Sequence, residues 1–361
     1  MRIGVPLYKY IKTNGGNIIG QTDLKTFVTV DSKGKINGLS DIENDGADFG
    51  PDTAGTKSSG IIEAINSSQS GNVILLDGEF RTESQITVRE GISIFGSQKS
   101  IIVNDIEDPY QPVLIFKPYT NCSFLIVNAN GKSGIQIGDE GNNSIKMDYV
   151  KVYNTGNSYI SNDESNIAVT IRGFNVTINA LDIYKGNIGI KIDGGSDIRI
   201  TDLQVVEAVS GLIIVSSEHV TFGHLSVDSC SHIGVQIDSS KDISLRGIIW
   251  NNATACPVNE LSYGILLGSY SSGYRNTLID IDANIIGTGG TAIKIENTDL
   301  CKLNLKIGND VLNTLGKKIV VGLEYGGGLG FIDTNLLTEN VDLPVNGKIV
   351  GRLVINGKSI S

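Results

Sequence analysis

The 361-residue chain has few aromatic side chains, few prolines and no excess of positive charge. Aromatic residues make up 6% of the chain and hydrophobic residues 40%, so the core must be aliphatic and general disorder is excluded. The formal net charge is -10, and no basic run alternates with aromatic residues, which argues against a nucleic-acid partner. This charge would also repel a polyanionic ligand unless a metal ion or a local basic patch intervened.

Long hydrophobic runs, a signal peptide and paired cysteines are missing as well. No segment is long enough to cross a bilayer, and the first residues contain no apolar stretch of signal-peptide length, so we expect neither membrane insertion nor ordinary secretion. The four cysteines form no Cys-x-x-Cys pair, which argues against a structural zinc site or a redox dithiol. They are interpreted as reduced thiols or, alternatively, as including a Cys230–Cys256 disulfide.

What the sequence does have is an internal repeat. A small residue followed by an apolar–x–apolar run recurs along most of the chain, and from Ala168 onward its starts are 21, 22, 23, 30 and 28 residues apart. Two more alternating runs follow in several repeats, for example at residues 243–245 and 248–250. The seven starts are Gly134, Ala168, Gly189, Gly211, Gly234, Gly264 and Ala292.

Runs of this length cannot bury a face on their own, because a two-stranded ribbon is only marginally stable in water. Three short strands per repeat, each paired with the like strand of the next repeat, solve this problem. Each coil then rises by ~4.8 Å, and its inward side chains form aliphatic columns. Alternating strands and helices would need amphipathic stretches that are missing here, and a sandwich would not give so regular a period. The sequence therefore predicts a parallel β-solenoid.

Residues 58–68 have the pattern of an amphipathic helix, with serine at the start, Glu63 in the first turn and apolar residues at helical spacing. Around this segment the chain reads Asp45-Gly-Ala-Asp-Phe-Gly-Pro-Asp52, Gly60-Ile-Ile-Glu-Ala-Ile65 and Gly71-Asn-Val-Ile-Leu-Leu-Asp-Gly-Glu-Phe80. These segments resemble the entry to right-handed parallel β-helices of the pectate-lyase-like superfamily, and the resemblance covers about residues 42–340. It implies an all-β fold of roughly ten coils with an N-terminal capping helix.

The chain is accordingly divided into three parts. Residues 1–41 are interpreted as an N-terminal arm or attachment segment, residues 42–340 as the β-helix with its capping helix, and residues 341–361 as a C-terminal hairpin or tail. The last part contains two Asn-Gly pairs, at Asn346 and at Asn356, which favour tight hairpin turns.

Aligning the repeats on their small residues places polar side chains in rows that could carry catalysis. Asp193 and Asp238 fall two coils apart, ~9.6 Å at the strand spacing, and two outward carboxylates at that separation suit an inverting glycosidase. Asp197, His219 and Asp242 form a second row across three adjacent coils, where His219 would have a raised pKa and could carry a proton. Stacked turn residues would produce the same rows without any catalytic role.

Binding residues are expected nearby. Arg172, next to Asp193, is interpreted as a ligand-binding side chain or as a surface ion pair of little energy. His219 and His224 flank a predicted strand and lie ~16 Å apart at the extended rise, so no metal site is expected, and no cofactor either. Aromatic residues of the longer loops are interpreted as a sugar-binding platform, with loop anchoring as the alternative: Tyr263, Tyr270, Tyr274 and Trp250.

The catalytic motifs of the superfamily are not found in this chain. Polygalacturonase-like enzymes carry Asn-Thr-Asp, Asp-Asp, Gly-His-Gly and Arg-Ile-Lys in chain order. Here Asn297-Thr-Asp299 follows Gly223-His224 instead of preceding it, and the other two motifs are absent. The acidic calcium cluster of pectate lyases and the Tyr-Gly-x-Asp-Pro-His of mannuronan epimerases are missing too. No known active site of the superfamily therefore transfers to this sequence.

Two functions from different classes remain. The first is a surface-projecting structural or receptor-binding protein, such as a virion spike or tailspike, that contacts a glycan or another host-surface receptor. Similarity to spikes of this fold implies a homotrimer, and virion parts, which are assembled inside the host cell, need no signal peptide. The expected location is therefore a virion or an extracellular surface. The second function is a polysaccharide hydrolase or lyase that uses the two acidic rows.

Overall fold

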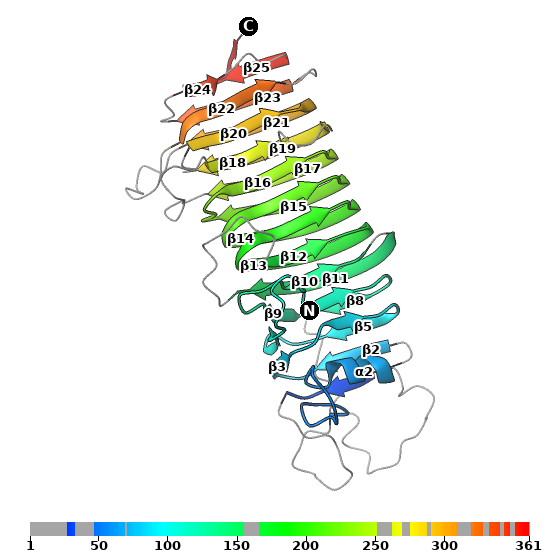
Figure 1. The fold of residues 1–361 in the computed structure, drawn as a ribbon. Helices are drawn as coiled ribbons and strands as arrows, with labels where there is room; N and C mark the ends of the chain where they lie inside the picture. Colours follow the sequence, from blue (N-terminus) through cyan, green and yellow to red (C-terminus); the bar gives the residue numbers. More distant parts are fainter. Residues whose placement is uncertain are drawn as a thin grey trace.

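The computed structural model describes residues 27–32, 47–68, 71–139, 141–154, 166–250, 262–268, 275–286, 290–308, 319–327, 332–339, 343–346 and 351–360. Within these ranges the chain forms one sheet of 26 strands and a single helix, α2. Every strand pairing is parallel except the last, between β25 and β26. Figure 1 shows the strands stacked along an elongated body, from β2 and α2 at one end to β25 at the other.

The strands lengthen toward the middle of the stack. The first ten are β1 (Phe27–Val30), β2 (Gly71–Leu75), β3 (Gly78–Thr82), β4 (Ile86–Val88), β5 (Ile92–Phe95), β6 (Ser100–Asn104), β7 (Leu114–Phe116), β8 (Asn121–Ser123), β9 (Leu125–Asn128) and β10 (Ile135–Ile137). The middle ones are β11 (Asn142–Tyr153), β12 (Ile167–Ile171), β13 (Phe174–Asp193), β14 (Ser196–Val215), β15 (Glu218–Asp228), β16 (Ile233–Asp238) and β17 (Lys241–Trp250). The last are β18 (Ser262–Leu267), β19 (Asn276–Ile286), β20 (Gly290–Glu296), β21 (Thr298–Gly308), β22 (Ile319–Gly327), β23 (Ile332–Glu339), β24 (Leu343–Asn346), β25 (Gly351–Ile355) and β26 (Lys358–Ile360).

Like strands of successive coils stack in register, which confirms the predicted parallel β-helix. Ile167 pairs with Ile188, Ile188 with Ser210 and Ser210 with Ile233, so the small residues that follow them lie over one another. Each complete coil has three faces. In the coil of β14, face B is residues 196–200, face C is residues 202–206, and face A is residues 210–215 at the end of the strand.

Aliphatic columns fill the interior, as the composition predicts. One column on face A is fully buried and contains Ile190, Leu212, Val235, Ile265 and Ile293. The small residue beside Ile190 is sterically required. A Cβ added to Gly189 would lie 2.5 Å from Cγ1 of Val205 and 2.6 Å from the carbonyl oxygen of Gly211 in the next coil. The repeat marker at Gly189 is therefore a point of close approach between successive coils.

The coil of β17 departs from the predicted offset. Thr221 pairs with Ser244, but Leu225 pairs with Gly247, so β17 has one residue fewer than β15 between these two pairs. The repeat pattern puts Ile248 at an inward position, yet it is 38% exposed. Its neighbour Ile249 is buried instead. Side chains of a strand alternate between faces, so a shift of one residue exchanges them.

A helix forms where the sequence predicts one, although it is shorter. α2 (Ile61–Ser67) begins after Gly60, whose left-handed φ of 84° turns the chain into the helix. The hydroxyl of Ser58 accepts a hydrogen bond from the N–H of Ile62 (3.0 Å) and donates one to the carboxylate of Glu63 (3.2 Å). The buried face of α2 belongs to the main core, and the helix packs against β1 and β4 at the N-terminal end of the stack (Figure 1). Its role as a cap stays a prediction.

Both terminal parts of the chain contribute strands. β1 lies inside the predicted N-terminal arm and pairs in parallel with β2, while residues 1–26 and 33–41 lie outside the described residues. At the other end, β24 and β25 continue the parallel stack, and β25 forms an antiparallel hairpin with β26. The turn of this hairpin is Asn356-Gly357, with φ of 50° and 76°, as the Asn-Gly pair predicts.

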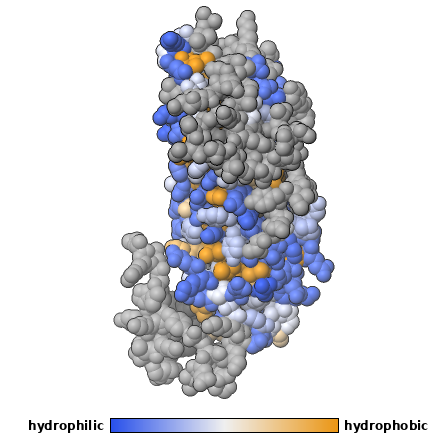
Figure 2. All heavy atoms as spheres, turned by 90° about the vertical axis from the view of Figure 1, so that its left-hand side faces the viewer, coloured by the Kyte–Doolittle hydropathy of each residue, from blue (hydrophilic) through white to orange (hydrophobic). Residues whose placement is uncertain are grey.

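Where Figure 2 colours the surface of the β-helix, it is mainly hydrophilic, with small hydrophobic patches between the polar residues. No helix in the described part of the chain is long and apolar enough to cross a membrane. Cys122, Cys230 and Cys301 are buried free thiols, and Cys256 lies outside the described residues. A free Cys230 favours the reduced thiols over the disulfide.

Candidate functional site

The turn from face A to face B contains one residue per coil with a left-handed backbone. Asn175, Asp197, His219 and Asp242 are in register with one another and have φ between 53° and 63°. Asparagine, aspartate and histidine tolerate this conformation better than most residues. At both ends the row continues with residue types that tolerate the left-handed conformation less well: Tyr119, Ser144, Leu278 and Leu300. The predicted row of Asp197, His219 and Asp242 is thus part of a longer one.

A buried polar ladder supports this corner from inside. The N–H of Gly195 donates to the hydroxyl of Ser217 (3.1 Å), and the N–H of Ser217 donates to the hydroxyl of Ser240 (3.2 Å). The N–H of Ser240 donates in turn to Oδ1 of Asn276 (2.9 Å), whose amide group also donates to the carbonyl oxygen of Ile237 (2.8 Å). Each turn is therefore hydrogen-bonded to the next coil, which holds the outward side chains in place.

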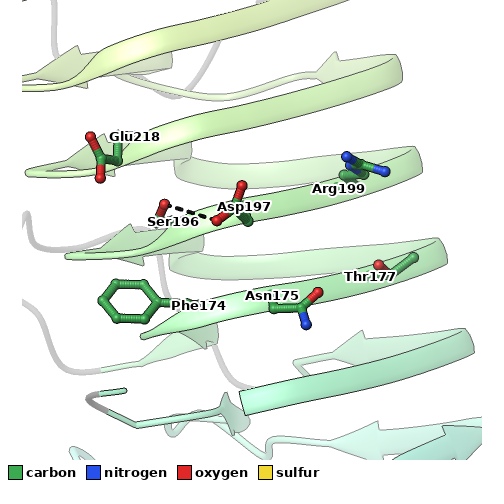
Figure 3. Close-up of a pocket in the computed structure, with 7 residues that line it drawn as sticks. All are labelled: Phe174, Asn175, Thr177, Ser196, Asp197, Arg199 and Glu218. Carbon is green, nitrogen blue, oxygen red and sulfur yellow. Dashed lines mark hydrogen bonds between the residues drawn. The ribbon is translucent and has the colours of Figure 1, made fainter. Parts of the chain in front are cut away.

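Three adjoining pockets of the described surface follow this corner along face B. One of about 570 Å³ is lined by the seven residues of Figure 3: Phe174, Asn175, Thr177, Ser196, Asp197, Arg199 and Glu218. A second of about 490 Å³ shares Asn175 and Thr177 and adds Tyr119, Asn121, Ser144, Ile145 and Lys146. A third of about 350 Å³ shares Phe174, Ser196 and Glu218 and extends to Lys241, Arg275 and Thr277. Because they share residues, we treat them as one depression, the corner groove.

The corner groove combines two aromatic rings with polar groups. Tyr119 is 51% exposed and Phe174 is 44% exposed, so both rings present apolar surface to solvent. In Figure 3, Phe174 and Glu218 lie toward one end of the strands and Arg199 toward the other, with Asp197 between them. A depression with apolar rings and a few convergent polar groups has the composition of a ligand site.

The structure stacks Asp193 and Asp238 two coils apart, as the alignment predicts, but not in the corner groove. Val215 lies between them in the register. The carboxylate of Asp193 is 3.6 Å from the nearest nitrogen of Arg172 and 3.6 Å from Nζ of Lys191. Asp238 is only 8% exposed, and Ser239 donates a hydrogen bond to its carboxylate. Asp238 is therefore not the solvent-accessible carboxylate that an inverting glycosidase would need at this position.

His219 makes a short contact with its neighbour in the row. Its Nδ1 lies 2.7 Å from the carboxylate of Asp242, and this hydrogen bond, together with the charges of Asp242, Glu218 and Asp197, raises the pKa of His219. His224 contacts a different carboxylate, that of Asp202, at 2.9 Å. Among the described residues, no group of three or more His, Cys, Asp or Glu side chains is arranged to hold a metal ion.

The aromatic residues singled out by the sequence do not line the corner groove. Tyr263 on face A is half-buried, and Nζ of Lys294 lies 5.6 Å from the centre of its ring. Trp250 is 38% exposed at the end of β17. Tyr270 and Tyr274 lie outside the described residues.

Sequence reasoning missed most of the residues that do line the groove. Glu218 and Lys241 stand directly before His219 and Asp242, so the same alignment contains them one column earlier. Phe174 pairs with Ser196, although it follows its repeat start by one residue fewer, and a fixed offset therefore overlooks it. Only the structure shows that Phe174 and Glu218, which are two coils apart, line one pocket.

Comparison with known proteins supports the fold. No protein-family model matches the chain, and no curated protein matches its sequence. The Dettilon tailspike protein superposes with a TM-score of 0.56 at 13% identity, covering 82% of this chain and 62% of the tailspike chain. A hyperthermoactive exopolygalacturonase from Thermotoga maritima gives 0.57 at 15% identity, with 83% and 87% covered. The chain is thus a parallel β-helix protein, shorter than the tailspike that it resembles.

Proposed function

We propose that this chain is a surface-projecting β-helix protein, such as a virion spike or tailspike, that binds a glycan in the corner groove. One observation carries the proposal: two exposed aromatic rings, Tyr119 and Phe174, border one continuous depression rich in hydrogen-bonding side chains. The two similar structures support it by name, since one is a tailspike and the other a polysaccharide-degrading enzyme.

The groove matches the two kinds of surface on a sugar. A pyranose ring has an apolar C–H face, which stacks on an aromatic ring, and a rim of hydroxyl groups, which needs donors and acceptors. Asn121 and Asn175 offer amide groups, and Asp197 and Glu218 offer carboxylates that accept hydrogen bonds from hydroxyls.

The length and direction of the groove fit an extended oligosaccharide. From the coil of Tyr119 to that of Thr277 there are six coil rises, or ~29 Å at the strand spacing. The ladder of Ser217, Ser240 and Asn276 holds part of this wall rigid before binding, which lowers the entropic cost of association. An extended glycan would therefore lie parallel to the long axis of the β-helix.

The test is loss of glycan binding on removal of the rings. Tyr119→Ala and Phe174→Ala should each weaken binding to immobilised surface glycans by roughly fivefold, since an aromatic contact contributes about 1 kcal/mol. Tyr110→Ala is the matched control, because Tyr110 is 60% exposed and lies outside the groove. Equal losses in all three variants, or no loss in the first two, would refute a glycan site in the corner groove.

A polysaccharide hydrolase or lyase is the second candidate, and one observation favours it. Asp197 and Glu218 come from neighbouring coils and line the same pocket as Arg199. If the chain cleaves glycans, new reducing ends or unsaturated uronates should appear, and Asp197→Asn or Glu218→Gln should abolish them. Asp193→Asn, which alters a carboxylate outside the groove, should leave the activity intact. Binding without any product would support the spike alone.

The remaining expectations concern assembly. We propose that the protein is a homotrimer on a virion or an extracellular surface, attached through residues 1–41, and the tailspike similarity supports this. Light scattering of the purified chain should give three times the monomer mass. A variant lacking residues 1–26, which keeps β1, should retain glycan binding but lose attachment.

A further inference from the structure

The corner groove is locally basic in an acidic protein. Its lining includes four cationic side chains, Lys146, Arg199, Lys241 and Arg275, but only two anionic ones, Asp197 and Glu218. Arg275 is paired with Asp299 (2.9 Å), and the other three cations still outnumber the two carboxylates. The whole chain has a formal net charge of -10. Such a local excess of positive charge attracts anions to a surface that the protein as a whole would repel.

Three of these cations lack the carboxylate partner that many other basic side chains of the surface have. Elsewhere, basic side chains are neutralised by carboxylates of the same chain, as in Arg81 with Asp105 (2.9 Å) and Lys185 with Glu207 (3.6 Å). Lys146, Arg199 and Lys241 form no ion pair with any residue that the structure describes. Their charges are therefore available to a ligand.

The three unpaired cations recur on every second coil. Lys146 pairs with Thr177, which pairs with Arg199, so Lys146 and Arg199 are two coils apart in one row. Arg199 lies in the coil before that of Glu218, and Lys241 lies in the coil after it. Lys241 stands three residues closer to the corner, ~10 Å along the strand direction, so the line of cations turns toward the corner at this end. The cations therefore repeat at ~9.6 Å along the axis.

The coils between the cations carry no positive charge at these positions. Thr177 lies between Lys146 and Arg199, and Glu218 lies between Arg199 and Lys241. A ligand with an anion on each sugar would place one of its charges against the carboxylate of Glu218, which costs binding energy. A ligand with an anion on alternate sugars would avoid that contact, because two coil rises are about the length of an extended disaccharide.

We infer that the corner groove recognises an acidic glycan that lies along the β-helix axis and carries one anionic group on every second sugar. The inference rests on the proposed function and specifies its ligand. The anionic group is a carboxylate or a phosphate, since Lys and Arg bind both. The neutral sugars then face Thr177 and Glu218, and the rings of Tyr119 and Phe174 stack on the C–H faces.

Matched oligosaccharides of equal length test the spacing by isothermal titration calorimetry. One set has a carboxylate on alternate sugars and differs in linkage: hyaluronate, unsulfated chondroitin and heparosan. A second set is the same three after carboxyl reduction, and a third, polygalacturonate, has a carboxylate on every sugar. At low salt, at least one member of the first set should bind about tenfold more tightly than its reduced form and than polygalacturonate. Screening should shrink the difference in 1 M NaCl, where the Debye length is about 3 Å.

Variants that remove one positive charge each test whether the three cations of the groove bind the anionic groups. Lys146→Gln, Arg199→Gln and Lys241→Gln should each weaken binding of the preferred oligosaccharide by about two- to fivefold, as expected for exposed charge pairs. Lys302→Gln is the matched control, because Lys302 is exposed on the same face in the row of Arg199 but lies outside the groove. Glu218→Gln should reduce the difference in affinity between the preferred oligosaccharide and polygalacturonate. An alternating phosphate oligosaccharide that binds more tightly than the carboxylate ones would assign the anion as phosphate.

The outcomes separate the inference from the proposed function. Equal affinity for acidic and reduced oligosaccharides, with binding still lost in Tyr119→Ala and Phe174→Ala, overturns the alternating-charge ligand and leaves the glycan groove standing. Equal losses in Lys302→Gln and in the three groove variants overturn it too, because the effect would then come from net charge alone. Absence of binding to every oligosaccharide, acidic or neutral, overturns both.

Discussion

Replacing Gly189 with leucine should destabilise the middle of the β-helix, since this position has no room for a side chain. The new Cβ would lie 2.5 Å from Cγ1 of Val205 and 2.6 Å from the carbonyl oxygen of Gly211. Non-bonded carbon atoms prefer about 3.5–4.0 Å, so the next coil must move away or Val205 must leave its rotamer. Overpacking of this kind costs about 1–3 kcal/mol, and leucine should reach the upper end of that range.

The dependence on side-chain size distinguishes crowding from backbone strain. Gly189→Ala should cost less than Gly189→Leu, and Ala168 and Ala292 show that other coils accept one methyl group in this row. Gly91 is the control, because its φ is 76° and a Cβ there would have nothing within 4 Å. Gly91→Ala and Gly91→Leu should therefore cost the same, about 1–2 kcal/mol for the left-handed backbone.

Urea unfolding followed by circular dichroism measures both pairs of variants. A shift of the midpoint at constant slope reports stability without a change in the surface exposed on unfolding. The reasoning would be refuted if Gly189→Leu unfolded at the same urea concentration as Gly189→Ala. The row of small residues that contains Gly189 would then not be a place of close contact between neighbouring coils.

Three further predictions follow from buried or paired groups. The pKa of His219 is raised by its hydrogen bond to Asp242, so Asp242→Asn should lower that pKa in an NMR titration, and an unchanged value would contradict the contact. Because the folded-state pKa is the higher one, this stabilisation is present at acid pH and is lost as the pH rises through it. Asn276→Ala should lower the free energy of unfolding by about 1–3 kcal/mol, since the N–H of Ser240 and the carbonyl of Ile237 lose a buried partner. If this variant unfolded at the same urea concentration as the wild type, the two hydrogen bonds of Asn276 would not stabilise the fold. Burial raises the pKa of the described thiols, so iodoacetamide should spare them in the native protein, and alkylation found by peptide mapping would disprove their burial. These thiols are Cys122, Cys230 and Cys301.

Much of the fold could be predicted because its steric requirements repeat. A residue such as Gly189 must be small, and it is followed by inward aliphatic residues, so each coil marks its own start in the sequence. Counting from these markers also predicts that Asp197, His219 and Asp242 stack. The prediction fails where a coil gains or loses one residue, as at Ile248.

The candidate site could be predicted only in part. Asp197 lines the corner groove, but Asp193 is paired with Arg172, and Asp238 is almost inaccessible to solvent. Whether a polar residue lines a groove, forms an ion pair or is covered depends on its neighbours in three dimensions. Turns of similar composition differ by a single residue or a single φ, and these differences have no period in the sequence.

By itself, the sequence of this protein determined the architecture: the length of a coil, the aliphatic columns and the rows in which residues of different coils meet. Only the tertiary structure decided which row faces solvent as a groove and which cations in it lack a partner. The physical reason is that stacking is set by a local steric pattern that every coil repeats. The surroundings of Phe174, Arg199 and Glu218 are instead set by three coils together, through the left-handed residues of their turns.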